Sequence, residues 1–175
     1  ALLQVPAGAS DLIQIYRNGS TIANSSSPAV NVSSQSIGFF NITAQFVGNT
    51  NYSASRETWY LTVRDTTNPA IHDVNATPNV TSYGRNITIY ANVTDNYALA
   101  DVQVAINGSN NTMIPLGGDL YGYTFNTTDY AVGSYTFSVY ANDSFGNNAT
   151  PQSDSFTIEK ANSTLVLYLD GGEDN

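Results

Sequence analysis

Apolar and polar side chains alternate with a period of two along most of this chain, and no other feature limits its fold as strongly. In residues 86–94, every second residue from Ile87 to Val93 is apolar, and Thr, Tyr and Asn stand between them. This alternation is typical of a β-strand with one buried face. Residues 100–107 and 134–142 repeat the pattern, and no segment shows helical spacing with capping residues. The sequence therefore predicts an all-β fold.

Two pairs of matching segments indicate an internal repeat. Asn18-Gly19 and Asn107-Gly108 each follow an alternating segment and lie 89 residues apart. Asn-Gly favours the type I′ turn of a β-hairpin, because both central residues of that turn need a positive φ. The segments that begin at Gly38 and Gly133 both have an aromatic residue two positions later and lie 95 residues apart. A repeat of about 95 residues has the size of a two-sheet β-sandwich.

The repeat divides the chain into three predicted parts. Residues 66–160 form a complete sandwich domain, residues 1–65 an incomplete domain that lacks its first strand, and residues 161–175 the first strand of a following domain or a donor strand. We expect Tyr135, at the start of the penultimate strand, to form a tyrosine corner or to be an ordinary core aromatic. The predicted strands are 11–18, 29–33, 38–47 and 56–64 in the first domain and 70–76, 86–94, 100–107, 111–116, 120–126, 134–142 and 153–159 in the second.

Charge and composition exclude several classes of protein. With 14 acidic and 5 basic residues the net charge is -9, which disfavours nucleic acid and anionic membranes, since both require clustered Lys and Arg. The chain has no Cys and one His, so a thiol nucleophile, a disulfide framework and a thiolate metal site are excluded. Glycoside hydrolysis needs two carboxylates, but no spacing singles out a pair among Asp119, Asp129 and Asp154. We therefore expect that the protein is not an enzyme.

Five stretches carry a family resemblance. They are IYRNGS at 15–20, AQFVGNTNY at 44–52, ANVTDN at 91–96, YANDSFGN at 140–147 and KANSTL at 160–165. With them, nearly the whole chain resembles the tandem immunoglobulin-like repeats, of the Big or fibronectin type III kind, of archaeal and other prokaryotic cell-surface, S-layer-associated or filament proteins. The resemblance implies Greek-key β-sandwiches and an extracellular stalk, adhesin or filament, and it brings no catalytic residues. The chain departs from antibody-type domains because it lacks the two core Cys.

N-x-Ser/Thr sequons, the acceptor motif of N-glycosylation, occur fifteen times. Random placement of the 21 Asn and 37 Ser plus Thr would give about 4. The acceptors are Asn18, Asn24, Asn31, Asn41, Asn51, Asn75, Asn79, Asn86, Asn92, Asn107, Asn110, Asn126, Asn142, Asn148 and Asn162. An alternative explanation is that Asn and Thr abound in turns and exposed strands. We favour dense N-linked glycans, which would solubilise a surface with only 11% charged residues.

N-glycosylation requires passage across a membrane, so we expect an extracellular or cell-surface location. No apolar run approaches the roughly 20 residues that a membrane-spanning helix needs, and we do not expect the chain to span a membrane. Because the chain opens at Ala1 with neither Met nor a signal segment, we expect a mature product or an excerpt of a longer protein.

The first functional hypothesis is a structural subunit or repeat of a surface filament, stalk or layer whose partner is the protein itself. Leu165, Leu167 and Leu169 alternate on one side of a segment that belongs to no predicted complete domain. They could fill the incomplete first domain of the next subunit by strand donation. Alternatively, both ends belong to a longer covalent array of tandem repeats, and the sequence leaves both arrangements open.

The second hypothesis is an adhesin or carbohydrate-binding module that recognises a surface carbohydrate or another cell-surface ligand. Sugars would stack on exposed aromatic rings, although such Tyr residues more often serve cross-strand packing. The candidate rings are Tyr90, Tyr121, Tyr123, Tyr130 and Tyr140.

A calcium site is a smaller hypothesis. Asp65, Asp95 and Asp143 lie in loops that a sandwich brings to one end, and oxygen ligands there would suit Ca²⁺. The alternative is that these residues are ordinary turn formers. His72 alone does not indicate a metal site.

Overall fold

A computed structural model of the protein describes residues 12–26 and 29–165. The chain divides into two compact units, unit 1 at Ala1–Asp65 and unit 2 at Thr66–Asn175. Unit 1 contains β1 (Leu12–Arg17), β2 (Ser20–Ser26), β3 (Gly38–Phe46) and β4 (Ser55–Val63). Unit 2 contains β5 (Ala70–Thr77), β6 (Val80–Ser82), β7 (Asn86–Thr94), β8 (Leu99–Ile106), β9 (Ser109–Thr112), β10 (Ile114–Gly117), β11 (Leu120–Asn126), the 3-10 turn η1 (Thr127–Asp129), β12 (Gly133–Asp143) and β13 (Gln152–Glu159).

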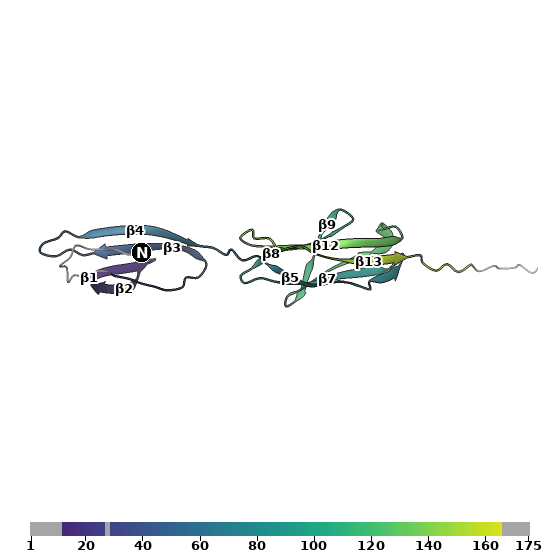
Figure 1. The fold of residues 1–175 in the computed structure, drawn as a ribbon, viewed down its shortest axis with the longest axis horizontal. Helices are drawn as coiled ribbons and strands as arrows, with labels where there is room; N and C mark the ends of the chain where they lie inside the picture. The colour runs from purple at the N-terminus through teal and green to yellow at the C-terminus, as the bar shows by residue number, and fades with distance from the viewer. Residues whose placement is uncertain (1–11, 27–28, 166–175) are drawn as a thin grey trace, which may run out of the picture. The chain divides into compact units, whose positions relative to one another are not determined.

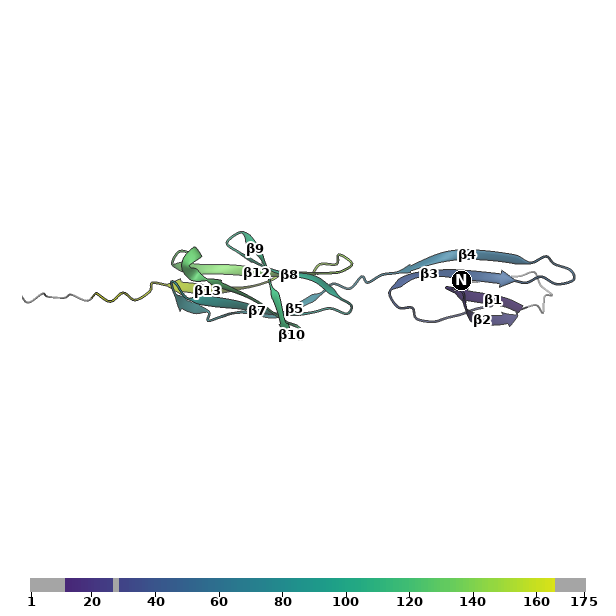
Figure 2. The ribbon, with the colours of Figure 1, turned by 180° about the vertical axis from the view of Figure 1, so that it is seen from behind.

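Unit 2 is an immunoglobulin-like β-sandwich, whose two layers of strands are visible in Figures 1 and 2. One sheet has the strand order β10-β11-β7-β5 and the other the order β6-β13-β12-β8-β9. The four apolar residues from Ile87 to Val93 are each at most 1% exposed, which confirms the alternation expected for β7. With side chains from β8, β11, β12 and β13 they form the core between the sheets.

Tyr135 combines both roles expected of it. Its hydroxyl donates a hydrogen bond to the carbonyl oxygen of Ala131, four residues upstream, at 2.8 Å, which is the geometry of a tyrosine corner. Its ring stacks on Phe156 with the centroids 5.4 Å apart. Phe156 in turn contacts Phe125 of the opposite sheet at 5.4 Å and Phe137 at 6.2 Å. This aromatic cluster therefore packs the two sheets together.

Unit 1 has one sheet among its described residues, with the order β2-β1-β3-β4 (Figure 1). Residues directly opposite one another in a sheet point to the same side, so the strand registers sort the side chains into two faces. We call one of them the apolar face; its apolar residues include Ile13, Ile15, Phe40, Ile42, Ala44, Phe46, Trp59 and Leu61, and the same registers place Arg17, Ser55 and Glu57 on it. The opposite face carries mostly polar side chains, among them Gln14, Asn41 and Thr58.

The sheet of unit 1 repeats one sheet of unit 2 in register. Gly38 pairs with Val63 in unit 1, and Gly133 pairs with Ile158 in unit 2, so both positions are shifted by 95 residues. The Asn residues of the two Asn-Gly turns adopt the expected positive φ, at 47° and 49°. Strands β4, β3, β1 and β2 therefore correspond to β13, β12, β8 and β9. No counterpart of the sheet β10-β11-β7-β5, or of β6, is present among the described residues of unit 1.

Two strand predictions are wrong in detail. Residues 29–33 form no strand, and only Ala29 makes an isolated β-bridge, because the described part of unit 1 offers no second sheet with which they could pair. The predicted strand 111–116 is two strands, β9 and β10, which belong to different sheets and are separated at the buried Met113. Neither β2 nor β6 was predicted, since β2 is polar and β6 has three residues. No helix within the described ranges is long and apolar enough to cross a membrane.

Candidate functional site

The three acidic residues suggested for calcium come together in the structure. Asp65 lies two residues after β4, Asp95 directly follows β7, and Asp143 is the last residue of β12. One carboxylate oxygen of each lies within 4.8 Å of those of the other two. Because β7 and β12 belong to the two facing sheets of one sandwich, the loops that follow them meet at one end. We call these three residues the acidic cluster.

Asp143 is fixed by its own loop and is 1% exposed. Its Oδ1 accepts hydrogen bonds from the backbone N–H groups of Phe145 at 2.9 Å and Asn147 at 2.8 Å, and its Oδ2 accepts one from Asn147 Nδ2 at 2.6 Å. Burial alone would raise the pKa of Asp143, but the hydrogen bonds from Asn147, Phe145 and Gly146 outweigh it and lower the pKa below its ordinary value of 3.8. Asp143 is therefore an anion at neutral pH.

Asn147 was not among the residues indicated by the sequence, although it makes two of the hydrogen bonds that orient Asp143. The signal that could have identified it is local. Gly146 has a φ of 87°, so the chain turns back and brings the next residue to the carboxylate of Asp143. An Asp followed by Gly and Asn three and four positions later is compatible with such a turn.

Asp95 contributes a buried oxygen without a hydrogen bond. Its Oδ2 accepts a hydrogen bond from the backbone N–H of Tyr97 at 2.9 Å, whereas its Oδ1 is buried and has no hydrogen-bond partner among the described residues. This loop is held against the loop after β12 by a hydrogen bond from Ser144 N to Ala98 O at 2.9 Å and by the ring contact between Tyr97 and Phe145 at 5.4 Å. Both loops are thus preorganised around the cluster.

The acidic cluster suits a hard divalent cation in charge and in donor type. Three carboxylates this close repel one another, and a cation between them would offset the repulsion. The buried Asp95 Oδ1 would gain a partner, which removes the cost of leaving a buried polar atom unsatisfied. Ca²⁺ takes six to eight oxygen ligands at about 2.3–2.6 Å, so water or backbone carbonyls would complete the shell. His72 is exposed and its Nε2 lies 3.3 Å from Thr94 Oγ1, outside this group.

All fifteen sequon Asn residues lie in the described part of the chain, and none is buried. Eleven are exposed, and the four half-buried ones are Asn31, Asn41, Asn92 and Asn142. Asn41 and Asn92 lie on strands with their neighbours pointing to the opposite face, as the alternation predicts. Asn31 differs from the others, because its Nδ2 donates a hydrogen bond to the carbonyl oxygen of Ile22 at 2.7 Å. The acceptor nitrogen of Asn31 is therefore already engaged.

Most of the Tyr residues considered as a carbohydrate platform belong to the core instead. Tyr121, Tyr123 and Tyr130 pack against the core of unit 2, and Tyr90 is half-buried. Tyr140 is 43% exposed and lines an open depression of about 440 Å³ with Asp101, Gln103, Asn110, Asn142 and Asn148. The three carboxylates Asp119, Asp129 and Asp154 are all exposed, which is typical of solvated acids.

The leucines proposed as a donor strand fall only partly within the structure. Leu165 is 96% exposed, and Leu167 and Leu169 lie outside the described residues.

Comparison with known proteins agrees with this fold. Residues 69–139 match a family model described as a bacterial Ig domain. This match and the sandwich topology agree that unit 2 is an immunoglobulin-like domain, the fold that the sequence resemblance implied. Domains of this class are generally non-catalytic structural modules. The match covers less than half of the chain and lies within unit 2. No curated protein matched the sequence.

Several solved structures are similar at low identity. One holds fibronectin(III)-like modules of Clostridium thermocellum CbhA, at 16% identity and a TM-score of 0.46, covering 95% of this chain and 87% of that one. Another is a tetra-tandem repeat in the extending region of a large adhesion protein, at 18% identity and a TM-score of 0.48, covering 89% of this chain and 43% of that one. A third is a Ca²⁺-stabilized adhesin that helps an Antarctic bacterium bind ice, at 16% identity and a TM-score of 0.38, covering 87% of this chain and 41% of that one. The chain thus spans less than half of each adhesin structure.

Proposed function

We propose that this protein is a structural repeat of a glycosylated extracellular assembly, such as a surface filament, stalk or S-layer-like coat. The observation that carries the proposal is that fifteen sequons occur where about 4 are expected and that none of their Asn residues is buried. The match to a bacterial Ig domain supports a surface protein. A catalytic role is not required by any arrangement of side chains described above.

Glycans have a physical task on this surface. Only 11% of the residues are charged, so charge alone provides little solubility. Exposed strand edges can pair with other chains, and bulky groups on them block that pairing. Three edge strands carry exposed acceptors, namely β2 with Asn24, β5 with Asn75 and β9 with Asn110. Glycans at these positions would limit unwanted pairing between neighbouring copies.

Glycopeptide mapping of native material tests the proposal. We expect sugar on most of the exposed acceptors, and we expect the same sample to form a large assembly before boiling in denaturant. Material without any sugar would contradict the proposal. The size after boiling separates two ways of building the assembly: a released polypeptide of 175 residues indicates association between subunits, and a much longer polypeptide indicates a covalent array.

We also propose that the acidic cluster binds Ca²⁺. Ligand that binds only the folded state stabilises it by about 2.7 kcal/mol at 100 times Kd, so Ca²⁺ should raise the melting temperature of unit 2 relative to a chelator. Asp95→Asn should abolish the shift, and Asp154→Asn, which changes an exposed acid on β13, should not. An unchanged shift in Asp95→Asn would contradict the site.

The alternative function is an adhesin or carbohydrate-binding module that uses the depression beside Tyr140. An exposed ring among polar side chains suits a sugar. However, three of the lining residues, Asn110, Asn142 and Asn148, are sequon acceptors. Glycans there would occupy the depression, so the two functions compete for the same surface. Binding of glycans to the native protein that is lost in Tyr140→Ala would favour the alternative.

A further inference from the structure

We propose that unit 1 binds residues 163–169 of a second copy of this chain as an additional strand beside β4. The inference rests on the proposed structural function and names the partner and the surface for it. Three observations carry it: the apolar face of unit 1 is open near β4, the corresponding face of unit 2 is covered, and residues 163–169 have the alternating apolar pattern of a strand that would cover it.

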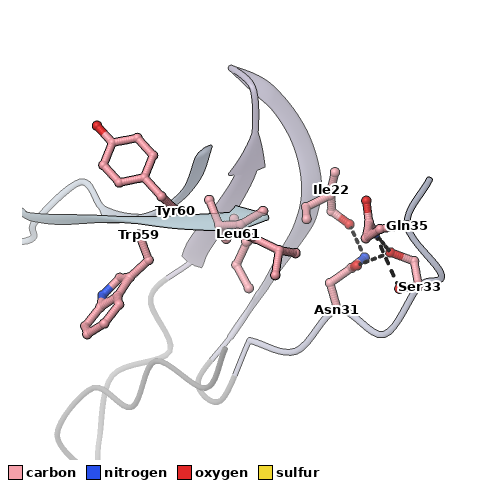
Figure 3. A pocket seen from close by; sticks show the side chains of 9 residues that line it. Ile22, Asn31, Ser33, Gln35, Trp59, Tyr60 and Leu61 are labelled. Carbon is pink, nitrogen blue, oxygen red and sulfur yellow. Dashed lines mark hydrogen bonds between the residues drawn. The ribbon is translucent and has the colours of Figure 1, made fainter. Parts of the chain in front are cut away.

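The open part of the apolar face lies along β4. Figure 3 shows Trp59 and Leu61 extending from one side of β4 and Tyr60 from the other. Trp59 is 69% exposed and Leu61 is 39% exposed. With Ile15 and Ile42 they line an open cavity of about 340 Å³, far more than the roughly 10–15 Å³ that one water needs. Its polar lining residues are Asn31, Ser33 and Gln35. Most of the lining is apolar, so the hollow suits an apolar partner.

Unit 2 shows what normally covers this position. Leu61 corresponds to Phe156, by the shift of 95 residues that relates β4 to β13. Phe156 is 1% exposed, because Phe125 of the facing sheet packs on it. In addition, β6 pairs in parallel with one edge of β13, and the corresponding edge of β4 has no partner strand within residues 12–26 and 29–65. Among the residues that the structure describes, no strand therefore lies beside this edge of β4, and an exposed apolar residue lies next to it.

Residues 163–169 have the properties of the missing strand. Leu165, Leu167 and Leu169 alternate on one side, and no residue from 161 to 169 is charged. Leu165 lies seven residues after Ile158, just as Ala70, the first residue of β5, lies seven residues after Val63. Strand β5 pairs with β7 in the facing sheet, so the spacing indicates a strand after β13, and the place beside β4 rests on the open edge of β4. The leucines of the segment would lie on the same side as Trp59 and Leu61.

The edge strand β4 also lacks the sequon acceptors that are present on several other edge strands. Strand β2, the opposite edge of the unit 1 sheet, carries the exposed acceptor Asn24. Residues 55–63 of β4 contain no Asn, so no N-linked glycan can be attached to that strand. The edge where a strand from another copy would pair is therefore the one left accessible.

Complementing variants of the full chain test the proposal. The donor variant replaces Leu165, Leu167 and Leu169 with Asn, and the acceptor variant is Leu61→Asn. We expect the unaltered chain to form concentration-dependent oligomers in sedimentation velocity and each variant alone to be a monomer. An equimolar mixture of the two should form a 1:1 heterodimer, because one copy keeps its strand and the other keeps its surface.

Trp59 reports binding directly, because it is the single Trp of the chain and lies in the proposed interface. Mixing the two variants should shift its fluorescence to shorter wavelength and protect it from a soluble quencher. A single Leu167→Asn in the strand should raise the dissociation constant at least ten-fold, because burial of one Leu stabilises a complex by more than the roughly 1.4 kcal/mol that a ten-fold change corresponds to. The matched controls change the opposite sides: Val166→Asn with Tyr168→Asn in the strand, and Thr62→Asn in β4. These controls should still associate.

Three results would overturn the inference. The unaltered chain could remain a monomer at all concentrations, as it would if residues 1–11 of the same chain covered the surface. The mixture of folded variants could fail to form the heterodimer. The opposite-side controls could block association as strongly as the donor variant, which would indicate non-specific apolar contact. Glycopeptide mapping is independent of all three, so failure here and failure of the proposed function are distinguishable.

Discussion

Phe156 and Leu61 occupy corresponding positions in the two units, so replacing each with Ala measures what the second sheet contributes to unit 2. Phe156 is 1% exposed and lies 5.4 Å from both Phe125 and Tyr135. Removing such a ring costs about 3–5 kcal/mol, by lost transfer free energy and the cavity left behind. Leu61 is 39% exposed. Since full burial of Leu is worth about 1.5–3 kcal/mol, Leu61→Ala should cost roughly 1–2 kcal/mol.

The two units can be followed separately in thermal unfolding. Trp59 fluorescence reports unit 1 alone, and far-UV circular dichroism reports both. A change of 1 kcal/mol shifts the melting temperature by about 4–8 °C in a domain of 60–100 residues. Phe156→Ala should therefore lower the transition of unit 2 by more than about 10 °C and leave the Trp59 transition unchanged. Both variants are made in the donor variant, so that no strand from another copy covers Leu61. An equal loss for Leu61→Ala would refute the argument that unit 1 lacks a covering layer.

Three further predictions concern single positions. Burial, and then the charges of Tyr123, Asp129 and Tyr135, raise the pKa of Tyr130 above its ordinary value of 10.0. Tyr130 therefore ionises at lower pH in the unfolded state than in the folded state, and the free energy of unfolding of unit 2 should fall as the pH rises above 10.0. Urea unfolding at several pH values should show a smaller fall in the Tyr130→Phe variant. Gly108→Ala should lower the free energy of unfolding by about 1–2 kcal/mol, because residue 108 has a φ of 80°. Gly48→Ala should lower it more, because the added Cβ would also lie 2.8 Å from the backbone nitrogen of Ala54. Melting temperatures of the two variants compare these effects. Glycopeptide mapping should show lower occupancy at Asn31, whose amide nitrogen is hydrogen-bonded, than at the exposed Asn24.

The parts of the fold that follow from local pattern could be predicted from the sequence. The alternation in β7 and the two Asn-Gly turns depend on residues next to one another, and both are as expected. Residues 29–33 fail for the opposite reason. Their strand-like composition has an effect only when a partner strand is present, and the described part of unit 1 has none for them. Strand formation is a property of the pair of strands, not of one segment.

The acidic cluster shows the same distinction within one site. That Asp95 and Asp143 approach one another follows from their places after β7 and β12, because sandwich topology brings those loops to one end. Their hydrogen bonding does not follow from topology. Asn147 reaches Asp143 because Gly146 turns the chain back, while Asp95 Oδ1 has no hydrogen-bond partner in the described residues. Such differences depend on dihedral angles and on loop packing, which the spacing of residues does not encode.

The two units use the same sheet in two different ways. In unit 2, the pattern of β8, β12 and β13 is covered by strands of the same unit, and the result is a closed core. In unit 1, the described buried apolar residues of the equivalent strands are Ile13 and Ile15 of β1 and Phe46 of β3, and the side near Trp59 stays open. The described residues of unit 1 therefore leave part of this apolar face exposed, with Trp59 at 69% and Leu61 at 39%. Association with a strand from outside the unit, as proposed above, would bury this apolar area, so the stability of unit 1, unlike that of the closed unit 2, would be coupled to assembly.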